Sequence, residues 1–354
     1  MRWVALPAGI VLLVFTLLDV FRTMVMPRAA RGRFRLTRVL FLAVWRPWYW
    51  IGVRQKTAAA RERVLSAAAP FSLFILLAAW AGLAIVAYAL IMWSPGLVHG
   101  VHGGQSFGNV MYVSGTSFWT IGFSGHIQAT GWTRGAVVIE AATGLGLVAV
   151  VIAYLPVLYQ SFNRREVGIL MLDARAGSPP SGPDLLLRAK ERGAHADLDR
   201  LFREWERWAS DVLETHLSYP LLAFFRSPHD NTSWVTALGA VLDAATIYIV
   251  AIDHDSDPAE LFYATGAHAV EDLWQYFRLP ERTAVIERSE FDGVLDKLAG
   301  LGVRLRDRDL AWDRFLELRA AYGGRLDALA VRVAATPAQW IGDRSTLPLG
   351  SSRH

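Results

Sequence analysis

Three long apolar segments lie in the first half of the chain, at residues 4–24, 69–93 and 135–162. Each is close to the length of about 20 residues that a helix needs to cross a bilayer core. The pattern therefore predicts three membrane-spanning helices. From about residue 166 onward, apolar residues instead recur every three to four positions between charged residues, which is typical of amphipathic helices in a water-exposed domain.

Charge between the spans predicts their orientation. Residues 27–68 contain Glu62 as their only acid, set against a run of basic residues: Arg28, Arg31, Arg33, Arg35, Arg38, Arg46, Arg54, Lys56, Arg61 and Arg63. Cytoplasmic loops carry such an excess of Lys and Arg, so we expect this segment in the cytoplasm and the N-terminus (residues 1–26 form the first span) outside. The loop at 94–133 has no Lys, Arg, Asp or Glu and is expected outside. Within the basic segment, the aromatic-rich residues 39–53 have the composition of a helix lying in the membrane interface, which Pro47 is expected to break.

Two charges interrupt the first apolar segment. Asp19 and Arg22 lie three residues apart, on one face of a helix, and can pair with each other or with a neighbouring helix. The alternative is that Asp19 and Arg22 sense voltage or protons. A cleaved signal peptide is disfavoured, because these charges break the apolar run and no small-residue cleavage pattern follows.

The composition agrees with a membrane protein. Hydrophobic residues make up 53% of the chain, charged residues 19%, and the mean hydropathy is +0.28. The chain has no cysteine, which excludes disulfides, thiolate catalysis and thiolate metal sites.

A short motif lies in the uncharged external loop, between the second and third spans. Residues 106–119 form an aromatic, amphipathic stretch too short to cross the bilayer, so we expect a helix that enters partway and directs its partly negative C-terminal end toward cations. The residues that follow can present backbone carbonyls in place of an ion's water shell: Thr120, Ile121, Gly122, Phe123 and Ser124.

This motif and its setting resemble the two-transmembrane-helix pore module of bacterial potassium channels, whose filter reads Thr-Val-Gly-Tyr-Gly. The resemblance covers residues 69–163 as outer helix, pore helix, filter and inner helix, and Thr130 and Arg134 match the residues that precede the family's inner helix. It implies a homotetramer, because each chain supplies one loop and the filter needs four. It also implies potassium or another monovalent cation as the permeant ion, with no further cofactor and no metal site.

Three residues of the third span match the family's gating elements. Gly144, ten residues after Arg134, resembles the hinge glycine, Gly146 offers a second flexible point, and Pro156 resembles a proline bend. Close helix packing is the alternative for the glycines, and a plain helix end is the alternative for the proline.

The filter also departs from the family pattern. Ser124 replaces a glycine at a position that needs unusual torsions, Gly125 replaces the common acid, and Phe123 lacks the tyrosine hydroxyl. Phe118 and Trp119 keep the aromatic packing beside the filter. A weakly selective cation filter is therefore an alternative to potassium selectivity.

Glu140 is the only acid between Trp93 and Glu166, and it lies within the third span. A carboxylate is costly in a membrane and is expected to face protein or water. We expect it to support the pore helix or the filter from behind; lining the cavity or proton-dependent gating is the alternative.

The second half of the chain predicts an all-helical cytoplasmic domain at 184–340, after a linker at 164–183 in which residues 177–183 are rich in Gly, Pro and Ser, and before a tail at 341–354. Six helices are expected, at 184–192, 196–216, 233–252, 257–277, 289–298 and 310–335. No Gly-x-Gly-x-x-Gly follows a strand, so a Rossmann-type sensing domain is not expected. Residues 236–252 are apolar almost all round, but their short length and central Asp243 favour a buried core helix over a fourth span.

A polar cluster precedes that core helix and comprises His216, Tyr219, Arg226, His229, Asp230 and Asn231. One interpretation is helix capping, by Asp230, Asn231 or the nearby Ser233. The other is a regulatory site that senses a ligand, protons or a metal, since histidine titrates near neutral pH.

The sequence thus predicts an all-α membrane protein of the plasma membrane: a tetrameric cation channel, contacting lipid and not nucleic acid, whose inner helices bend under control of a helical cytoplasmic domain. The alternative to a channel is a membrane-anchored sensor, or an enzyme whose activity lies in the cytoplasmic domain. No nucleophile elbow, His-Glu-x-x-His or phosphate-binding glycine loop supports an enzyme.

Overall fold

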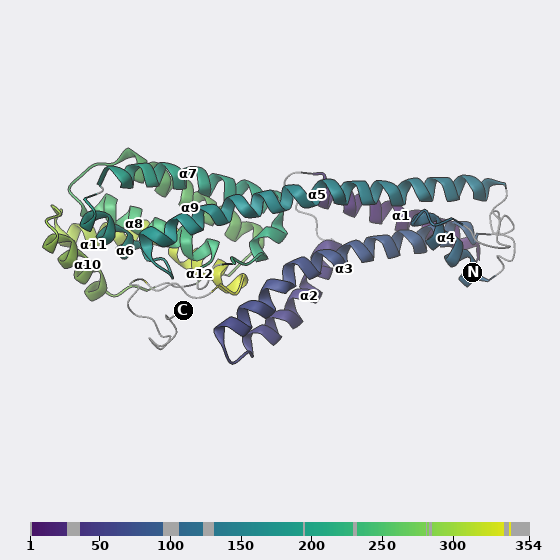
Figure 1. Ribbon diagram of the computed structural model, residues 1–354, viewed down its shortest axis with the longest axis horizontal. Helices are drawn as coiled ribbons and strands as arrows, with labels where there is room; N and C mark the ends of the chain where they lie inside the picture. Colours follow the sequence, from purple (N-terminus) through teal and green to yellow (C-terminus); the bar gives the residue numbers. More distant parts are fainter. Residues whose placement is uncertain are drawn as a thin grey trace. The chain divides into compact units, whose positions relative to one another are not determined.

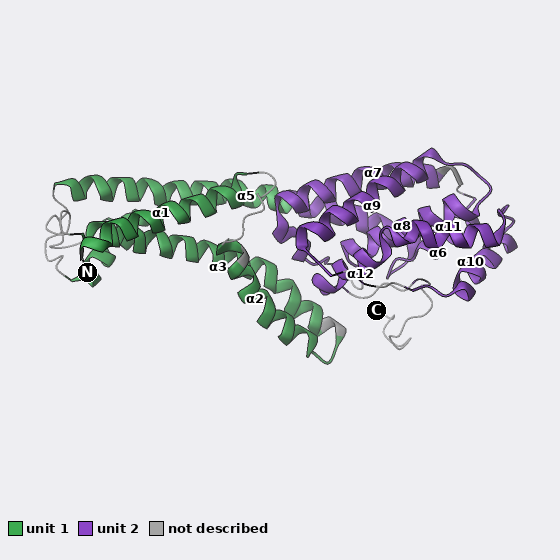
Figure 2. Ribbon diagram, turned by 180° about the vertical axis from the view of Figure 1, so that it is seen from behind, with its two compact units in different colours: residues 1–159 green, residues 160–354 purple. Residues whose placement is uncertain are grey.

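The computed structural model describes residues 2–26, 36–94, 106–122, 131–193, 195–228, 232–280, 282, 285–335 and 340 (Figure 1). The chain divides into two compact units, residues 1–159 and 160–354 (Figure 2). Over the described ranges the regular structure is helical, and the only β-type pairing is an isolated bridge between Ile252 and Leu305. The predicted all-helical class is therefore confirmed.

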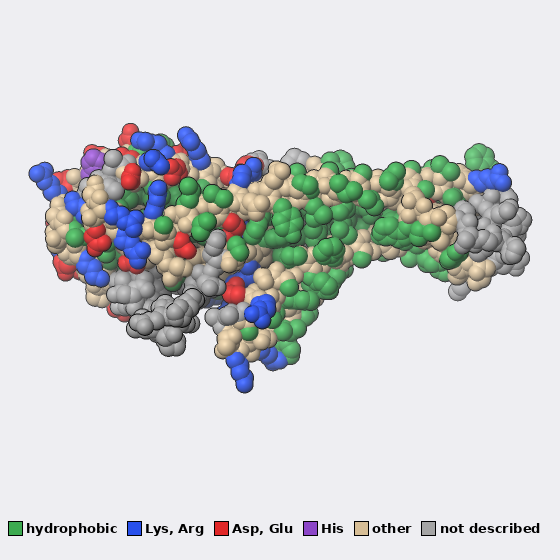
Figure 3. All heavy atoms as spheres, in the orientation of Figure 1, with side chains coloured by type: hydrophobic (Ala, Val, Ile, Leu, Met, Phe, Trp, Pro, Cys, Tyr) green, Lys and Arg blue, Asp and Glu red, His purple; other side chains and the backbone are tan. Residues whose placement is uncertain are grey.

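Unit 1 contains four complete helices and the first part of a fifth. These are α1 (Arg2–Met24), α2 (Leu36–Val53), α3 (Ala58–Met92), α4 (Phe107–Phe118) and α5 (Trp132–Ala176), which continues into unit 2. Helices α1, α2 and α4 all pack against α3. Hydrophobic side chains cover much of the visible surface over α1, α3 and α5 (Figure 3). The three predicted spans correspond to α1, the second part of α3 and the first part of α5.

Helices α2 and α3 form an antiparallel hairpin. Trp45 of α2 is 3% exposed, Leu65 of α3 is fully buried, and the Trp48 indole N–H donates a hydrogen bond to the carbonyl of Val64 at 2.8 Å. The predicted break at Pro47 is wrong, because α2 runs through it. Proline removes one backbone hydrogen bond, and the burial of Trp45 and the contacts of Trp48 with Val64 and Phe71 of α3 stabilise the helix despite that loss.

The short helix α4 lies against the outer part of α3. Val110 and Val113 of α4 are buried with Tyr88 and Met92 of α3, and Ala136 of α5 packs beside this cluster. With 12 residues and a rise of about 1.5 Å per residue, α4 is too short to cross a bilayer. Its position between two spans matches the order expected of a pore helix.

Helix α5 is much longer than predicted and runs through Pro156 to Ala176. A plain helix end at Pro156 is therefore excluded, and the expected linker at 164–183 is wrong over most of its length. Ile169 and Leu172 are each 1% exposed, so burial in unit 2 stabilises the helix through residues assigned to the linker. The turn that follows α5 occupies residues 177–181, within the turn-rich stretch expected at 177–183.

Unit 2 is a helical bundle around one apolar helix. It contains α6 (Gly182–Glu191), α7 (His195–Ser218), the 3-10 helix η2 (Pro220–Phe224), α8 (Trp234–Ala251), α9 (Asp257–Phe277), α10 (Arg288–Gly300), α11 (Arg308–Ala320) and α12 (Gly323–Arg332). Helix α8 contacts α6, α7, α9, α11 and α12, and 89% of its apolar window is buried. By length and composition α8 is the fourth described helix able to span a membrane, but its burial within protein confirms the predicted core helix.

The predicted helix at 310–335 is instead two helices, α11 and α12, which are separated at Tyr322. A side chain added at Gly324 would place Cβ 1.9 Å from the carbonyl oxygen of Arg282. The Tyr322 hydroxyl donates to Asp243 of α8 at 2.7 Å. The close backbone contact at Gly324 and the hydrogen bond between Tyr322 and Asp243 fix the corner between α11 and α12. Helical periodicity in the sequence did not reveal this corner.

Candidate functional site: the turn after α4 and the Arg165 network

The chain turns sharply where α4 ends. The backbone N–H of Thr120 donates to the carbonyl of Ser117, and that of Ile121 donates to Thr116, both at 2.9 Å. Gly122 has φ of +84° and Thr120 has φ of +55°. Glycine adopts such torsions without steric cost, whereas a residue with a Cβ is strained by about 1–2 kcal/mol. Gly122 is therefore required by the backbone, as the resemblance implied; Phe123, Ser124 and Thr130 lie outside the described residues.

The two aromatic residues beside the turn lie in different surroundings. Phe118 is 2% exposed and packs against Ala81 and Ala84 of α3. Trp119 is 51% exposed, and its ring meets that of Phe118 edge-on with centroids 5.4 Å apart. Phe118 thus anchors the end of α4 to α3, while Trp119 leaves an aromatic surface free for lipid or another chain.

Glu140 is fully buried and faces α4. The Ser114 hydroxyl lies within hydrogen-bond reach of the Glu140 carboxyl and 2.7 Å from the carbonyl oxygen of Ile85 on α3. A hydroxyl donates only one proton, so both contacts can be hydrogen bonds only if the carboxyl carries a proton and donates it. One serine thus connects α3, α4 and α5, and Glu140 lies against the short helix α4.

The environment of Glu140 contains no cation among the described residues. Its second carboxyl oxygen, Oε2, is buried without a hydrogen-bond partner in the described part of the chain. The neighbouring polar pair is Tyr88 of α3 and Thr143 of α5, whose hydroxyl oxygens are 2.8 Å apart. Polar contacts therefore join α5 to α4 at Ser114 and to α3 at Tyr88.

The two inner-helix glycines differ in their surroundings. A Cβ added at Gly144 would lie 1.9 Å from the backbone oxygen of Phe118, whereas one added at Gly146 would meet nothing within 4 Å. Gly144 thus permits α5 to approach the end of the pore helix, which agrees with the packing alternative. Gly146 keeps open space, and the hinge role of either glycine stays a prediction.

Asp19 joins neighbouring helices. It is 6% exposed, and its carboxylate accepts hydrogen bonds from the Trp80 indole of α3 and the Thr37 hydroxyl of α2, each at 2.9 Å. Arg22 is exposed. Of the two pairings considered from the sequence, the geometry therefore supports the contact of Asp19 with neighbouring helices.

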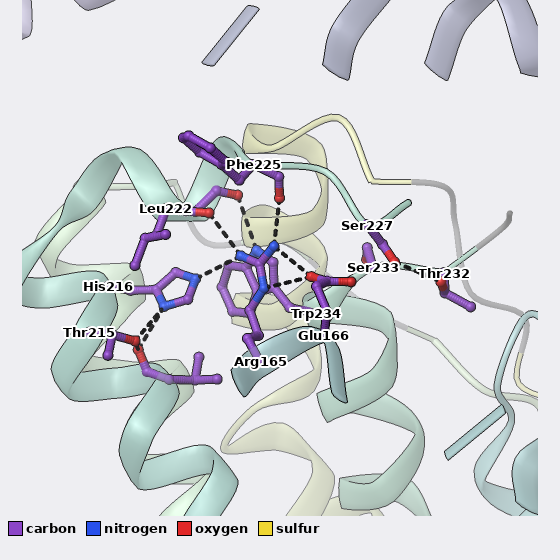
Figure 4. A network of polar contacts seen from close by, with 12 residues as sticks. Arg165, Glu166, Thr215, His216, Leu222, Phe225, Ser227, Thr232, Ser233 and Trp234 are labelled. Atoms are coloured by element: carbon purple, nitrogen blue, oxygen red, sulfur yellow. Dashed lines mark hydrogen bonds and ion pairs between the residues drawn. The ribbon is translucent and has the colours of Figure 1, made fainter. Parts of the chain in front are cut away.

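A second candidate site surrounds Arg165, in the part of α5 that belongs to unit 2 (Figure 4). The guanidinium is 2% exposed and donates to the carbonyls of Leu222 at 2.8 Å and Phe225 at 2.7 Å, and to Glu166 at 2.8 and 2.9 Å. Its Nη1 lies 3.2 Å from Nε2 of His216. The network ties α5 to the end of α7 and to η2.

The partners of His216 define its protonation. Nδ1 lies 2.7 Å from the carbonyl oxygen of Val212, which only accepts, while Nε2 faces Arg165, which only donates. The proton is therefore on Nδ1 and the ring is neutral. Burial, and then the charge of Arg165, hold the pKa of His216 well below its usual value. Both ring nitrogens are occupied, so the geometry does not support His216 as a metal ligand.

The other members of the predicted cluster have separate roles. Tyr219 precedes η2, with its backbone N–H donating to Thr215 at 2.7 Å. Arg226 donates to the carbonyls of Val333 and Ala334, each at 3.0 Å, just after α12. The capping residue of α8 is Ser233, which forms a capping box with Thr236. His229, Asp230 and Asn231 lie outside the described residues.

Sequence reasoning missed Arg165 and Glu166 as site residues. The signal was available, because Arg165 shares a helix face with Phe162, Ile169 and Leu172, and an arginine on an apolar face is expected to have buried partners. Those partners, His216, Leu222 and Phe225, are distant in sequence, so the local pattern could not identify them.

Two further features of unit 2 bear on ligands. Over the described ranges no group of three His, Asp or Glu side chains is placed to hold a metal ion. A hollow of about 330 Å³ lies between the end of α8 and the start of α11, and His254, Asp255 and Arg306 are among its lining residues. The Arg306 guanidinium donates hydrogen bonds to Asp255 at 2.6 Å and to the carbonyl of Ile252 at 2.9 Å. Arg306 and Asp255 of this hollow therefore bind each other.

Helices α1, α3 and α5 are long and apolar enough to cross a membrane, so the fold is that of a helical membrane protein with several transmembrane helices. The chain is 24% identical over 273 residues to the uncharacterized membrane protein YdjJ of Bacillus subtilis strain 168, which covers 75% of each chain. No family model and no solved structure matches the chain.

Proposed function

We propose that the protein is a homotetrameric channel for monovalent cations, with potassium preferred, in the plasma membrane. In this proposal the N-terminus lies outside and unit 2 lies in the cytoplasm, as the distribution of basic residues indicates. Carbonyl oxygens of residues 120–124 from four chains would replace the water shell of the ion.

The observation that carries the proposal is the backbone at Gly122. A 12-residue helix that cannot span a bilayer leads into a left-handed turn at Gly122, and it is anchored to one span at Phe118 and to the next at Gly144. Non-helical backbone at membrane depth is tolerated only where it is buried in protein or lines a water-filled cavity. A pore entrance satisfies that demand.

The exposure of α5 supports several copies. Only 11% of its apolar window is buried within one chain, against 28% for α1 and 39% for α3. Ile139, Leu145 and Ile152 of α5 are 61–66% exposed. In a tetramer, neighbouring copies would cover a helix that lines the pore. The low burial of α5 within a single chain agrees with that arrangement.

Gating would act through α5 itself. The helix enters unit 2, where Arg165 is bonded to three segments of that unit, so a rearrangement of the bundle would pull on the same helix that carries Gly146 and Pro156. This is the coupling between cytoplasmic domain and pore that the proposal requires.

Potassium flux from liposomes that contain the purified full chain tests the proposal. Wild type should release potassium, and Gly122→Val should abolish the flux, because valine cannot adopt φ of +84° without strain. Gly293→Val is the matched control, since Gly293 lies in α10 with open space around its Cβ position.

Assembly must be checked alongside flux. Native mass spectrometry should give four chains for wild type and for both variants. A flux that survives in Gly122→Val would refute the filter, and the absence of flux from well-assembled wild type would favour the rival sensor or enzyme.

A further inference from the structure

One surface of the α2–α3 hairpin combines exposed cations with exposed apolar side chains. Arg46, Trp50 and Arg54 follow one another at intervals of four residues, which places them on one face of α2 and its last turn. All three are exposed, Trp50 by 56%. Val39 and Val53 of the same helix are 58% and 42% exposed. We call Val39, Arg46, Trp50, Val53 and Arg54 the hairpin surface.

The exposure of Trp50 is unusual for this hairpin. Trp45 is buried and Trp48 packs on Phe71 with ring centroids 4.9 Å apart, so two of the three tryptophans of α2 serve the hairpin itself. The Arg54 guanidinium instead stacks on the Trp50 ring, with its central carbon 3.3 Å from the ring centroid. Stacking uses the flat face of the guanidinium and leaves the N–H groups at its edge available to an anion.

Three cations in the second half of α2 and just after it have no carboxylate partner in the described part of the chain. Among the residues that the structure describes, Arg46, Arg54 and Lys56 form no ion pair with a carboxylate. Glu62 is the only acid between Asp19 and Glu140 in the whole sequence. Lys and Arg side chains gather at the tip of the hairpin beside hydrophobic ones (Figure 3). The local field is therefore positive and uncompensated.

We propose that the hairpin surface binds the headgroup of an anionic phospholipid. Arg46 and Arg54 would hold the phosphate, and Trp50, Val39 and Val53 would lie against the glycerol and upper acyl carbons. A lipid is favoured over an acidic protein because α3 continues from this hairpin into a membrane span, and because exposed Trp and Val beside Arg is the composition of a membrane interface.

The proposal uses the cytoplasmic placement of residues 27–68, but it does not require ion conduction. A failure of the channel proposal would leave it intact. Conversely, a hairpin without lipid preference would leave the pore loop unaffected, so the two proposals can fail separately.

Native mass spectrometry of the purified full chain tests the lipid site. The protein is mixed in detergent with equal amounts of phosphatidylglycerol and phosphatidylcholine of identical acyl chains, and the bound lipids are counted. Wild type should retain phosphatidylglycerol in preference. Arg46→Gln with Arg54→Gln should lower that preference by about tenfold or more, because each basic side chain near an anionic surface contributes a factor of about five.

Two control variants make the result specific. Arg200→Gln with Arg314→Gln removes the same charge from exposed positions of unit 2 and should leave the preference unchanged. Arg46→Lys with Arg54→Lys keeps the charge and should keep most of the preference. All variants should elute as wild type does, which excludes misfolding.

Three outcomes would overturn the proposal. The first is a Gln double variant that keeps the wild-type preference, and the second is an equal loss in the unit 2 control, which would indicate a bulk charge effect. The third is displacement of bound lipid by glycerol phosphate at equal concentration, which would identify a soluble phosphate as the ligand.

Discussion

His216 and Glu140 illustrate how a single buried ionisable side chain can be assigned a role from its partners. His216 has a carbonyl on one nitrogen and an arginine on the other, and this arrangement requires a neutral ring. Glu140 shares one serine hydroxyl with a backbone carbonyl, and that arrangement requires a proton on the acid for both hydrogen bonds to form. Each conclusion follows from counting donors and acceptors.

The neutral state of His216 predicts a loss of stability in mild acid. In the folded protein the pKa is depressed, whereas the unfolded chain titrates near its usual value of about 6.5. Below that pH the unfolded state binds more protons, so the free energy of unfolding falls by up to about 1.4 kcal/mol per pH unit. The apparent melting temperature of the full chain should drop between pH 7.5 and 5.5.

The matched variant is His216→Gln, which cannot titrate but can still donate to Val212 and accept from Arg165. Its melting temperature should depend less on pH than that of wild type over the same range. Identical pH profiles for the two proteins would show that other groups account for the acid sensitivity.

The proton on Glu140 predicts that an amide can replace the acid. Glu140→Gln supplies an N–H donor to Ser114 and should melt close to wild type. Glu140→Ala removes the donor and leaves a cavity, and should lower the free energy of unfolding by about 1–3 kcal/mol. Thermal unfolding in detergent compares them; equal melting of Glu140→Gln and Glu140→Ala would contradict the assignment.

Among the helices, the contact between α4 and α5 depends on a missing side chain. At Gly144 the backbone of Phe118 occupies the place of a Cβ, whereas Gly146 has free space. Gly144→Ala should therefore separate the pore helix from α5 and cost about 1–3 kcal/mol. Gly146→Ala is the matched control and should melt as wild type does.

Flux distinguishes the roles of these glycines further. If Gly144 serves packing, Gly144→Ala should lose flux together with stability. If Gly146 serves bending, Gly146→Ala should change flux without changing the melting temperature. A stable, fully active Gly144→Ala variant would show that the close contact with Phe118 is dispensable.

The helices could be predicted from sequence wherever apolar spacing is local. The three apolar spans, the short helix α4 and the buried α8 follow from length and periodicity. The extension of α5 to Ala176 was not predicted, because the partners that bury Arg165 in unit 2, His216, Leu222 and Phe225, are distant in sequence. The corner at Tyr322 likewise depends on contacts with Asp243 and Arg282 that local periodicity does not encode.

The candidate site was predictable to a similar extent. Gly122, Phe118 and Gly144 were identified from the resemblance to a pore module, and Glu140 was identified as a lone acid within an apolar segment. Their partners, Ser114, Ile85 and Tyr88, resemble ordinary helix residues and are recognisable only in three dimensions. In unit 2 the sequence identified His216 but grouped it with Arg226, which instead binds the residues just after α12.

For the whole molecule, the account rests on cation passage through the turn at Gly122. The most direct measurement is the reversal potential of currents across a planar bilayer with potassium on one side and sodium on the other. A tenfold preference for potassium shifts this potential by about 59 mV from zero. For wild type we expect a shift in the direction that corresponds to potassium preference, and for Gly122→Val we expect no current. A wild-type protein that carries no current above that of the bare bilayer, or a current that persists in Gly122→Val, would contradict the account.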